Sequence, residues 1–455
     1  MTHEVNIQYS KEIKTMNTTS EKQSFDIGIA EEADVERDRL VAEAMLDSRK
    51  LVTFRTIDAI DPIPGADFIK VASIEGWKVV VKHDEFQPGD MCVFFEVDSF
   101  LPMGDLQYEF LRKNATTWHG IEGARLKTIR LRKTLSQGLA LPISAFPILQ
   151  QVIEVAEREG ATLRDINLTG ILRIPKWEKV MSTQLAGLAR GNFPSFLRKS
   201  DQERCQNIPN EIFGYEDEWF KLDTKNVPPE VVDVMVQRGE VKFFGQAPEM
   251  TGGWYKVRKA SASRDTRYEI SLKLDGSSMT VYCKGVDEDR VEGVCSRNLD
   301  LKLEGNEDNS FVQMAQNGIL DVLCKSGTDV AIQGELMGPG IQGNREDLTH
   351  NQFFIYNIFD IKTNEFMTPP ERLEWVRTAN VVSKNLFSQA MLDHVFVLHE
   401  SSTLAELGIT NMDQLLKFAE GPSLKNQVRE GLVFKAVDGK HQFKVISNQY
   451  LLNDK

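Results

Sequence analysis

A stretch of strict alternation near the middle of the chain places the strongest constraint on its fold. In YEISLKLDGSSMTVY, residues 268–282, Leu272 and Leu274 alternate with Lys273 and Asp275. Successive side chains of a β-strand point to opposite faces, so the pattern predicts a half-buried strand with its leucines on a core. The lysine and the aspartate then point together into a polar space. Such a strand can present an amine as a nucleophile beside a carboxylate.

The same four letters, Lys-Leu-Asp-Gly, have a simpler explanation. Lys273 could be a solvated lysine next to an Asp-Gly turn that ends a strand. A motif with three fixed residues occurs often by chance, so the residues that follow it must decide.

Composition limits the class of protein. With 455 residues the chain is long enough for two or three domains, and its 41% hydrophobic and 27% charged residues are ordinary for a water-soluble protein. It contains no apolar run of membrane-spanning length, and the opening MTHEVNIQYSKEIK is too polar for a secretory signal, so we expect a cytoplasmic protein without a membrane partner. The five cysteines are scattered, with no CxxC pair, and we expect reduced structural thiols rather than a zinc site or a disulfide framework. These cysteines are Cys92, Cys205, Cys283, Cys295 and Cys324.

A local basic segment stands out against the acidic whole. The net charge of −13 argues against nonspecific adhesion to nucleic acid. Residues 125–133, RLKTIRLRK, nevertheless interleave cations with apolar residues. The segment is either the solvated face of a strand or a strip that follows a phosphate backbone. Its cations are Arg125, Lys127, Arg130, Arg132 and Lys133.

The first part of the chain predicts a β-barrel. Residues 1–48 read as a flexible acidic leader that ends in a short helix. Residues 49–145 hold about five short β-rich runs separated by Pro-Gly and Ser-Gln-Gly turns, which suits a nucleic-acid-binding barrel of OB type. Residues 146–191 form a helical connector in this interpretation, because ILQQVIEVAERE has helical periodicity.

The rest of the chain, residues 192–455, reads as a second unit that mixes strands and helices. Its clearest predicted helices cover 311–325 and 404–418. The fold class expected for the whole chain is therefore α+β.

Further blocks follow Lys273 in a fixed order. They are SRN at 296–298, GELMGPGIQG containing Glu335 and Gln342, IFD containing Phe359, EGLVFK containing Glu430 and Lys435, and QFKVIS containing Lys444. As a set these blocks resemble the covalent nucleotidyltransferase superfamily of polynucleotide ligases and RNA-capping enzymes. GELMGPGIQ, IFD and EGLVFK resemble the RNA-ligase-2-like branch. FPSFLRKSDQERCQN and the barrel ahead of it resemble nick-sealing RNA ligases with an N-terminal OB domain, and the resemblance covers roughly residues 50–450.

The resemblance implies a catalytic domain of ATP-grasp-like antiparallel sheets with helices, and an ATP-dependent reaction. Lys273 would attack the α-phosphorus of ATP once it has lost the proton that its ordinary pKa of about 10.4 retains. Lys435, Lys444 and bound Mg²⁺ or Mn²⁺ would lower that pKa and neutralise the phosphate.

The expected site residues have assigned roles. Asp275, Glu335 and Glu430 are the candidate metal ligands. By resemblance Asp275 or Glu335 also reads the ribose, Arg297 contacts ribose or phosphate, and Phe359 stacks on adenine. The nucleotide-binding set is Lys273, Asp275, Gly276, Arg297, Glu335, Phe359, Glu430, Lys435 and Lys444, and the RNA-binding set is the basic segment with Gln342.

Each of these residues has an alternative structural role. Phe359 lies in an apolar run and could belong to a core, and Arg297 could be an ordinary surface residue. The carboxylates could pair locally, and Lys435 could lie on the solvated side of an edge strand. The last block also departs from the family, which often has two lysines one residue apart: here Gln442 and Ile446 flank Lys444, and Lys440 is out of register.

The sequence as a whole favours an ATP-dependent RNA ligase. It would act as a monomer on an RNA or RNA/DNA duplex with a 3′-OH/5′-phosphate nick. The alternatives are an ATP-dependent DNA ligase and a nucleic-acid-binding protein whose ligase domain is inactive. The missing second lysine favours the latter. DNA ligases and capping enzymes usually place an OB domain after the last lysine block. Here the predicted OB-type barrel precedes that block, which favours an RNA ligase over these relatives.

Overall fold

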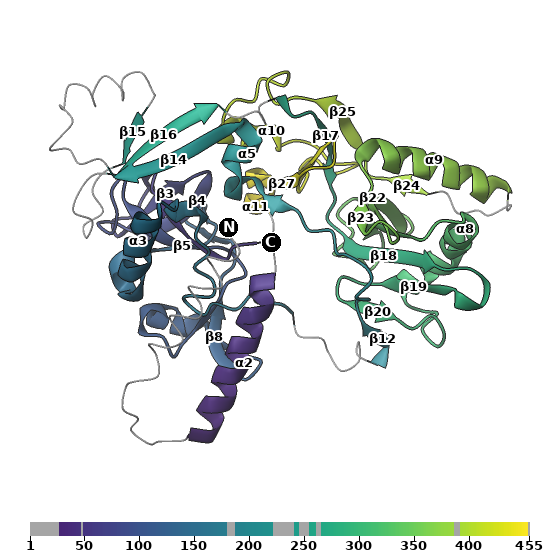
Figure 1. Ribbon diagram of the computed structural model, residues 1–455, viewed down its shortest axis with the longest axis horizontal. Helices are drawn as coiled ribbons and strands as arrows, with labels where there is room; N and C mark the ends of the chain where they lie inside the picture. Colours follow the sequence, from purple (N-terminus) through teal and green to yellow (C-terminus); the bar gives the residue numbers. More distant parts are fainter. Residues whose placement is uncertain are drawn as a thin grey trace. The chain divides into compact units, whose positions relative to one another are not determined.

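The computed structural model describes residues 27–46, 49–179, 187–221, 241–244, 254–260, 265–385 and 392–453. The chain divides into two compact units, shown with the sequence colouring in Figure 1. Unit 1 takes its residues from 1–180 and 209–261, and unit 2 from 181–208 and 262–455. No helix within the described ranges is both long and apolar enough to cross a membrane.

Small antiparallel sheets make up the β-structure of unit 1. Among the described residues before residue 180, four groups pair as β1-β5-β11, β2-β3-β4, β6-β8-β7 and β10-β9. Their bounds are β1 (Val52–Thr56), β2 (Ala59–Pro62), β3 (Ile69–Ile74), β4 (Trp77–Lys82), β5 (Met91–Phe95), β6 (Phe100–Pro102), β7 (Thr116–Trp118), β8 (Ile121–Arg125), β9 (Ile129–Leu131), β10 (Thr134–Ser136) and β11 (Leu139–Pro142). The mixed α+β fold with a β-rich N-terminal part agrees with the expected class.

Strand β5 explains why these sheets form one body. All five of its residues are buried. Val93 and Phe95 join one apolar core, whereas Cys92 and Phe94 join a second core with Trp77 of β4. A strand covered on both faces reads as a continuous apolar run, as MCVFF does. The sheets are also tied at their edges, because the backbone N–H of Val80 donates to Oγ of Ser136 at 3.0 Å.

Two helices pack onto this β-structure. Helix α2 (Ile27–Leu46) contains the helical end expected for the leader, and its Ala44 lies in the first core. Residues 1–26 of the predicted leader lie outside the described residues. Helix α3 (Ile148–Glu159) is the helix expected in the connector, and Leu149 and Ile153 belong to the same core as β1 and β5. The described part of the predicted connector up to residue 179 is thus packed on the barrel.

The remaining elements of unit 1 follow an excursion of the chain into unit 2. They are helix α5 (Pro209–Phe213) and a three-stranded antiparallel sheet in the order β14-β16-β15. The strands are β14 (Tyr215–Lys221), β15 (Val241–Phe244) and β16 (Trp254–Ala260).

Unit 2 is built on two sheets. The larger has the order β12-β20-β19-β18-β21-β22-β23, with β24 beside β22, and the smaller has the order β13-β27-β26-β17-β25. The larger contains β12 (Ala189–Asn192), β18 (Ser277–Lys284), β19 (Val291–Cys295), β20 (Leu299–Leu301), β21 (Val330–Met337), β22 (Gln352–Asp360), β23 (Glu365–Phe366) and β24 (Asp393–His394). The smaller contains β13 (Glu203–Arg204), β17 (Tyr268–Lys273), β25 (Val397–Ser402), β26 (Gly431–Ala436) and β27 (Gln442–Ile446).

The chain passes from the smaller sheet to the larger through residues 274–276. Strand β17 differs from the half-buried strand that the alternation predicts, because Glu269 and Ser271 are buried as well as Leu272, and only Lys273 is partly exposed. Gly276 is required at the crossing, because a Cβ there would lie 2.5 Å from the carbonyl oxygen of Leu336 and 2.9 Å from Cγ of Glu335. The crossing brings the ends of two sheets together at Lys273.

The helices of unit 2 differ from the sequence prediction in two places. They are α7 (Ser310–Met314), α8 (Leu320–Lys325), α9 (Pro369–Asn385), α10 (Met412–Phe418) and α11 (Asn448–Asn453). The single helix predicted over 311–325 is interrupted, because Gly318 takes a φ of 92°. The helix predicted over 404–418 begins only at Met412, because Gly408 has a φ of 70° and Asn411 caps the helix through its side chain.

The cysteines also depart from expectation. All five are predicted to be reduced, yet Cys283 of β18 and Cys324 of α8 form a disulfide. Strand and helix bring their Cα atoms to 5.5 Å, although 41 residues separate them in sequence. The other three cysteines are free and buried, as predicted.

Candidate active site

The candidate nucleophile lies at the end of β17, opposite Gly431 of β26. Nζ of Lys273 donates to Oε1 of Glu430 at 2.7 Å, and both side chains are mostly buried. Burial lowers the pKa of Lys273, but attraction to Glu430 and Glu335 and the hydrogen bond to Glu430 outweigh burial, so the net pKa is raised. The lysine is therefore held as an ammonium by its carboxylate partner.

Glu335 lies on β21, close to the crossing. Its Oε1 accepts from the backbone N–H of Gly276 at 3.0 Å. Burial raises the pKa of Glu335 to about 7; Lys273 lowers it and the negative charge of Glu430 raises it again. The sequence prediction that Lys273, Glu335 and Glu430 lie together holds in the structure.

The two glutamates fit a divalent cation. Oε2 of Glu430 is buried and has no hydrogen-bond partner among the described residues. A buried carboxylate oxygen without a donor is unfavourable unless a cation approaches it, and hard cations such as Mg²⁺ and Mn²⁺ prefer carboxylate oxygens. Burial is the main cause of the raised pKa of Glu335, and the negative charge of Glu430 adds to it, since one carboxylate charge disfavours the next.

Asp275 is held by two residues that the sequence did not single out. Its Oδ2 accepts from the hydroxyl of Tyr450 in α11 at 2.9 Å and lies 3.8 Å from Nε of Arg345. The guanidinium of Arg345 lies 4.5 Å from the centre of the Tyr450 ring. Asp275 therefore has a hydrogen-bond donor in Tyr450 and a cation nearby in Arg345. Tyr450 contacts both Asp275 and Arg345, and it lies after the last sequence block.

Lys435 lies on the same face of the smaller sheet as Lys273 but is buried. Its Nζ donates to Oδ1 of Asn357 and to the carbonyl oxygen of Tyr356. Burial, followed by the charge of Arg372, lowers the pKa of Lys435 well below its ordinary value. Lys435 is therefore not the solvated edge lysine of the alternative interpretation.

An ion pair lies under Lys435. Glu269, its cross-strand partner on β17, is 1% exposed, and so is the Arg372 guanidinium from α9 that lies 2.5 Å from it. The same guanidinium donates to the carbonyl oxygen of Tyr356, which Lys435 also contacts. The pair joins α9 to the smaller sheet.

The last block places Lys444 on β27 with Asp201 as partner. Nζ of Lys444 lies 3.2 Å from Oδ1 of Asp201, and Nη2 of Arg297 lies 3.9 Å from its other oxygen. Asp201 thus lies between the two cations that the sequence predicts to contact phosphate. The Arg297 side chain is 66% exposed, which is compatible with either of its predicted roles.

One of the two candidate positions for the missing second lysine, Gln442 and Ile446, is apolar. Ile446 pairs with Gly431, the residue that also faces Lys273. A cation reaches this neighbourhood from another strand: β13 pairs with β27, and the charge of Arg204 lowers the pKa of Lys273. Sequence reasoning missed Arg204, which lies 69 positions before the lysine, because no role was assigned to it within FPSFLRKSDQERCQN.

Phe359 is not at the site, which corrects the sequence prediction. It is 0% exposed and packs in a core with Tyr282 and Ala331, 5.3 Å from the ring of Phe366. No face of the ring is open to a base. The aromatic residue near the carboxylates is Tyr356 of the same strand, whose hydroxyl lies 2.9 Å from Oγ of Ser278. Ser278 is the cross-strand partner of Glu335.

The basic segment is divided by the fold. Arg125 ends β8, pairs with Asp98 at 2.6 Å and lies 3.7 Å from the centre of the Trp177 ring, so it has a structural role. Lys127 and Arg130, together with Arg132 and Lys133 in the β9–β10 turn, are exposed. Ile129 and Leu131 of β9 are 48% and 37% exposed, so both faces of this short strand meet solvent. Gln342, the remaining predicted RNA contact, is exposed in the loop after β21.

Comparisons with known proteins agree with this geometry. Residues 51–143 match the model of an OB-fold domain, and residues 266–446 match the model of the RNA ligase family. A Naegleria gruberi RNA ligase structure with PPi is 35% identical over 89% of this chain and 99% of that chain, with a TM-score of 0.64. A mutant of that ligase with AMP and Mn is 35% identical over 89% and 98%, with a TM-score of 0.63, and another with ATP and Mn is 35% identical over 88% and 98%, also with a TM-score of 0.63. Comparison with curated protein sequences gives no match.

Proposed function

Because this chain belongs to the RNA ligase family, we propose that it joins RNA ends with ATP through a covalent AMP on Lys273. The observation that carries the proposal is the contact of the Lys273 amine with Glu430, beside Glu335, at the junction of two sheets. An amine, two buried carboxylates and further cations are the groups that nucleotidyl transfer needs.

The chemistry assigned to these residues has three steps. Neutral Nζ of Lys273 attacks the α-phosphorus of ATP, a P–N bond forms, and pyrophosphate leaves. The AMP group then passes to a 5′-phosphate end, with the P–N bond broken and the lysine released. Finally a 3′-OH attacks the phosphorus of that activated end and AMP leaves.

The residues around Lys273 prepare the first step. Lys273 must lose a proton before it attacks. In the structure its ammonium group donates a hydrogen bond to Glu430, which can accept that proton. A bound Mg²⁺ or Mn²⁺ would be held by Glu335 and Glu430, and it would neutralise their charge and that of the α-phosphate. In the structure Lys444 and Arg297 lie next to Asp201. With ATP bound, both cations would contact phosphate in place of Asp201.

We propose a nick in duplex RNA as the substrate. Support comes from the β-rich unit 1, whose exposed cations on and near β9 can bind phosphates on either side of a nick. A DNA nick is the competing substrate and becomes an outcome of the test.

The test is the transfer of label from ATP. The wild-type protein with [α-³²P]ATP and Mn²⁺ should retain label after denaturation, and the P–N bond should make that label labile to acid and stable to base, whereas Lys273→Arg should retain none because an arginine does not deprotonate. Lys384→Arg, at the exposed end of α9, is the matched control. Wild-type protein without label would refute the covalent step. A panel of nicks with ribose or deoxyribose at the 3′-OH then assigns the substrate, and equal sealing of an all-DNA nick would favour a DNA ligase.

A further inference from the structure

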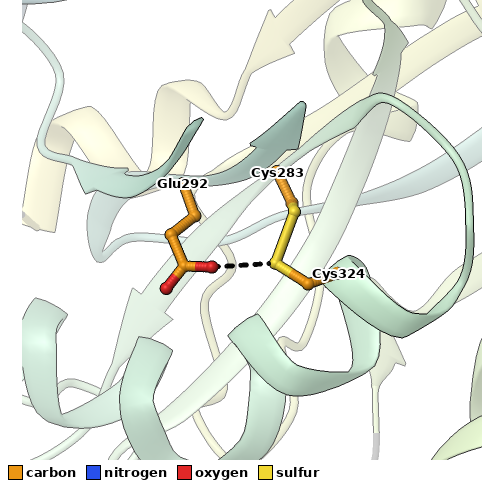
Figure 2. Close-up of side chains that lie close together, drawn as sticks. All are labelled: Cys283, Glu292 and Cys324. Atoms are coloured by element: carbon orange, nitrogen blue, oxygen red, sulfur yellow. Dashed lines mark hydrogen bonds between the residues drawn. A yellow bond between two sulfur atoms is a disulfide. The ribbon is translucent and has the colours of Figure 1, made fainter. Parts of the chain in front are cut away.

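A second cluster of donor atoms lies in unit 2, away from the residues assigned to ATP. Cys283 of β18, Glu292 of β19 and Cys324 of α8 face one another in Figure 2. One sulfur from each cysteine and one carboxylate oxygen all lie within 4.8 Å of one another. None of the three belongs to the sequence blocks of the ligase.

The backbone fixes these three residues independently of their chemistry. Cys283 and Glu292 are direct cross-strand partners, so their side chains share one face of the sheet. Helix α8 packs on that face, with Val322 and Leu323 in the same core as Cys283. Cys324 follows in the helix and turns toward the strand pair. Three elements that are held by the core therefore deliver the three side chains.

The carboxylate is the informative member of the cluster. Oε2 of Glu292 lies 3.1 Å from Sγ of Cys324, and the described residues offer this carboxylate no other polar contact. A disulfide sulfur carries no hydrogen, so the disulfide cannot donate to the carboxylate. A partly buried carboxylate directed at two sulfurs gains an interaction only when the sulfurs are thiols or bind a cation.

Two thiolates and a carboxylate are a recognisable ligand set. Zn²⁺ binds thiolate at about 2.3 Å and carboxylate oxygen at about 2.0–2.2 Å, in tetrahedral geometry. Donor atoms in such a site are about 3.3–3.8 Å apart, which the cluster reaches once the sulfurs separate. Glu292 and Cys324 are partly exposed, so a water molecule can supply the fourth ligand. Hard cations such as Mg²⁺ bind thiolates poorly, so this site and the carboxylate site would not share a metal.

We propose that Cys283, Glu292 and Cys324 form a zinc-binding site when the protein is reduced, and that the disulfide is the oxidised state of the same site. A thiol reductant supplies two electrons and two protons to the disulfide and is itself oxidised to a disulfide. Zn²⁺ then displaces the two thiol protons and binds both sulfurs and Glu292. The S–S bond links α8 to β18 in the oxidised state, and the metal links them in the reduced state.

Cobalt reports thiolate ligands directly, because thiolate-to-Co²⁺ charge transfer absorbs in the near ultraviolet. The full chain is reduced with a phosphine under argon and titrated with Co²⁺ in excess Mg²⁺. We expect a charge-transfer band that saturates at one Co²⁺ per chain and disappears when Zn²⁺ is added. The untreated disulfide form should give no band until it is reduced. A reduced wild type without the band would overturn the proposal.

Variants identify the ligands. Cys283→Ser and Cys324→Ser should each lose the two-thiolate spectrum, and Glu292→Gln should keep a band but bind at least tenfold more weakly. Cys295→Ser, which removes a buried free thiol from the same strand as Glu292, should leave the titration unchanged. A full band in both single cysteine variants would also overturn the proposal.

A second measurement guards against misfolding of the variants. Zn²⁺ should raise the melting temperature of the reduced wild type, and a chelator should reverse the rise. Glu335→Gln should retain both the band and the stabilisation, because it alters only the proposed catalytic metal site. Loss of ligase activity and loss of the zinc site are thereby separable results.

Discussion

At the residue scale, Glu335 has the property most easily tested in solution. Its pKa of about 7 lies above the ordinary value chiefly because it is buried, and Mn²⁺ binding requires the deprotonated form. Protons therefore compete with Mn²⁺ for the Glu335 carboxylate below pH 7 and no longer compete above it.

We therefore expect Mn²⁺ affinity to rise about tenfold per pH unit below pH 7 and to level off above it, for one displaced proton. Electron paramagnetic resonance of free Mn²⁺ measures the affinity. Glu335→Gln should weaken binding and flatten the profile, whereas Glu288→Gln, at an exposed turn, should leave it intact. A profile that stays steep in Glu335→Gln would assign the titration to another group.

Two of the aromatic residues of β22, Tyr356 and Phe359, should separate binding from stability. Tyr356→Ala should raise the KM for ATP about 5- to 100-fold, the range expected when one base–aromatic stacking interaction is removed. Phe359→Leu should leave KM unchanged and cost about 1 kcal/mol of unfolding free energy, because Phe359 is a core residue. Steady-state adenylation and urea unfolding measure the two effects. The opposite pattern would restore Phe359 as the base-stacking residue.

At the element scale, β13 brings Arg204 next to β27, where the family's second lysine is absent. Arg204→Ala should slow lysyl-AMP formation about tenfold at neutral pH, because removing a cation raises the pKa of Lys273 further. The pH–rate profile should shift to higher pH, and Arg204→Lys should restore it. An unshifted profile would mean that Arg204 acts only through structure.

The β9–β10 hairpin should bind RNA phosphates. The double variant Arg130→Gln, Arg132→Gln should reduce the slope of log affinity against log salt by about 0.9 for each phosphate that the hairpin no longer neutralises. Nick binding and sealing should fall, while lysyl-AMP formation persists. Arg158→Gln on α3, which is also an exposed arginine, is the control. An unchanged salt slope would make the hairpin an ordinary solvated edge.

The elements also show where sequence reasoning succeeds. The period of two puts Lys273 on the opposite face of β17 from Leu272, but it did not predict that the lysine's own face is covered as well, with Glu269 and Ser271 buried. Glu335 and Glu430 followed from the blocks GELMGPGIQG and EGLVFK, which resemble the family. Phe359 was assigned by resemblance alone, and the sequence gives no sign that Leu197, Tyr282 and Ala331 bury its ring in a core.

Two other features cannot be predicted from the residues next to them in the sequence. The pairing of Cys283 with Cys324 and the approach of Arg204 depend on which elements become neighbours in space. The helix predicted from residue 404 failed for a local reason, since Gly408 and the Asn411 cap outweigh its apolar pattern.

At the scale of the whole molecule, every residue assigned to adenylation belongs to unit 2, and unit 1 supplies the basic hairpin. A chain that begins at residue 181 should therefore form lysyl-AMP at a rate within about threefold of the full chain, while sealing falls at least tenfold. That chain keeps residues 209–261, so circular dichroism must first show that it folds. Loss of adenylation in a folded fragment would show that unit 1 takes part in the first step.

The buried pair of Glu269 and Arg372 restricts how this catalytic unit can evolve. Replacing either residue alone leaves an uncompensated buried charge, which typically costs about 3–5 kcal/mol, a large share of a domain's stability. Each substitution would be rejected before its partner could change, so the two positions are expected to remain fixed or to change together in descendants of this chain. Substitutions in strand β17 and in helix α9 are thus expected to be coupled at these two positions.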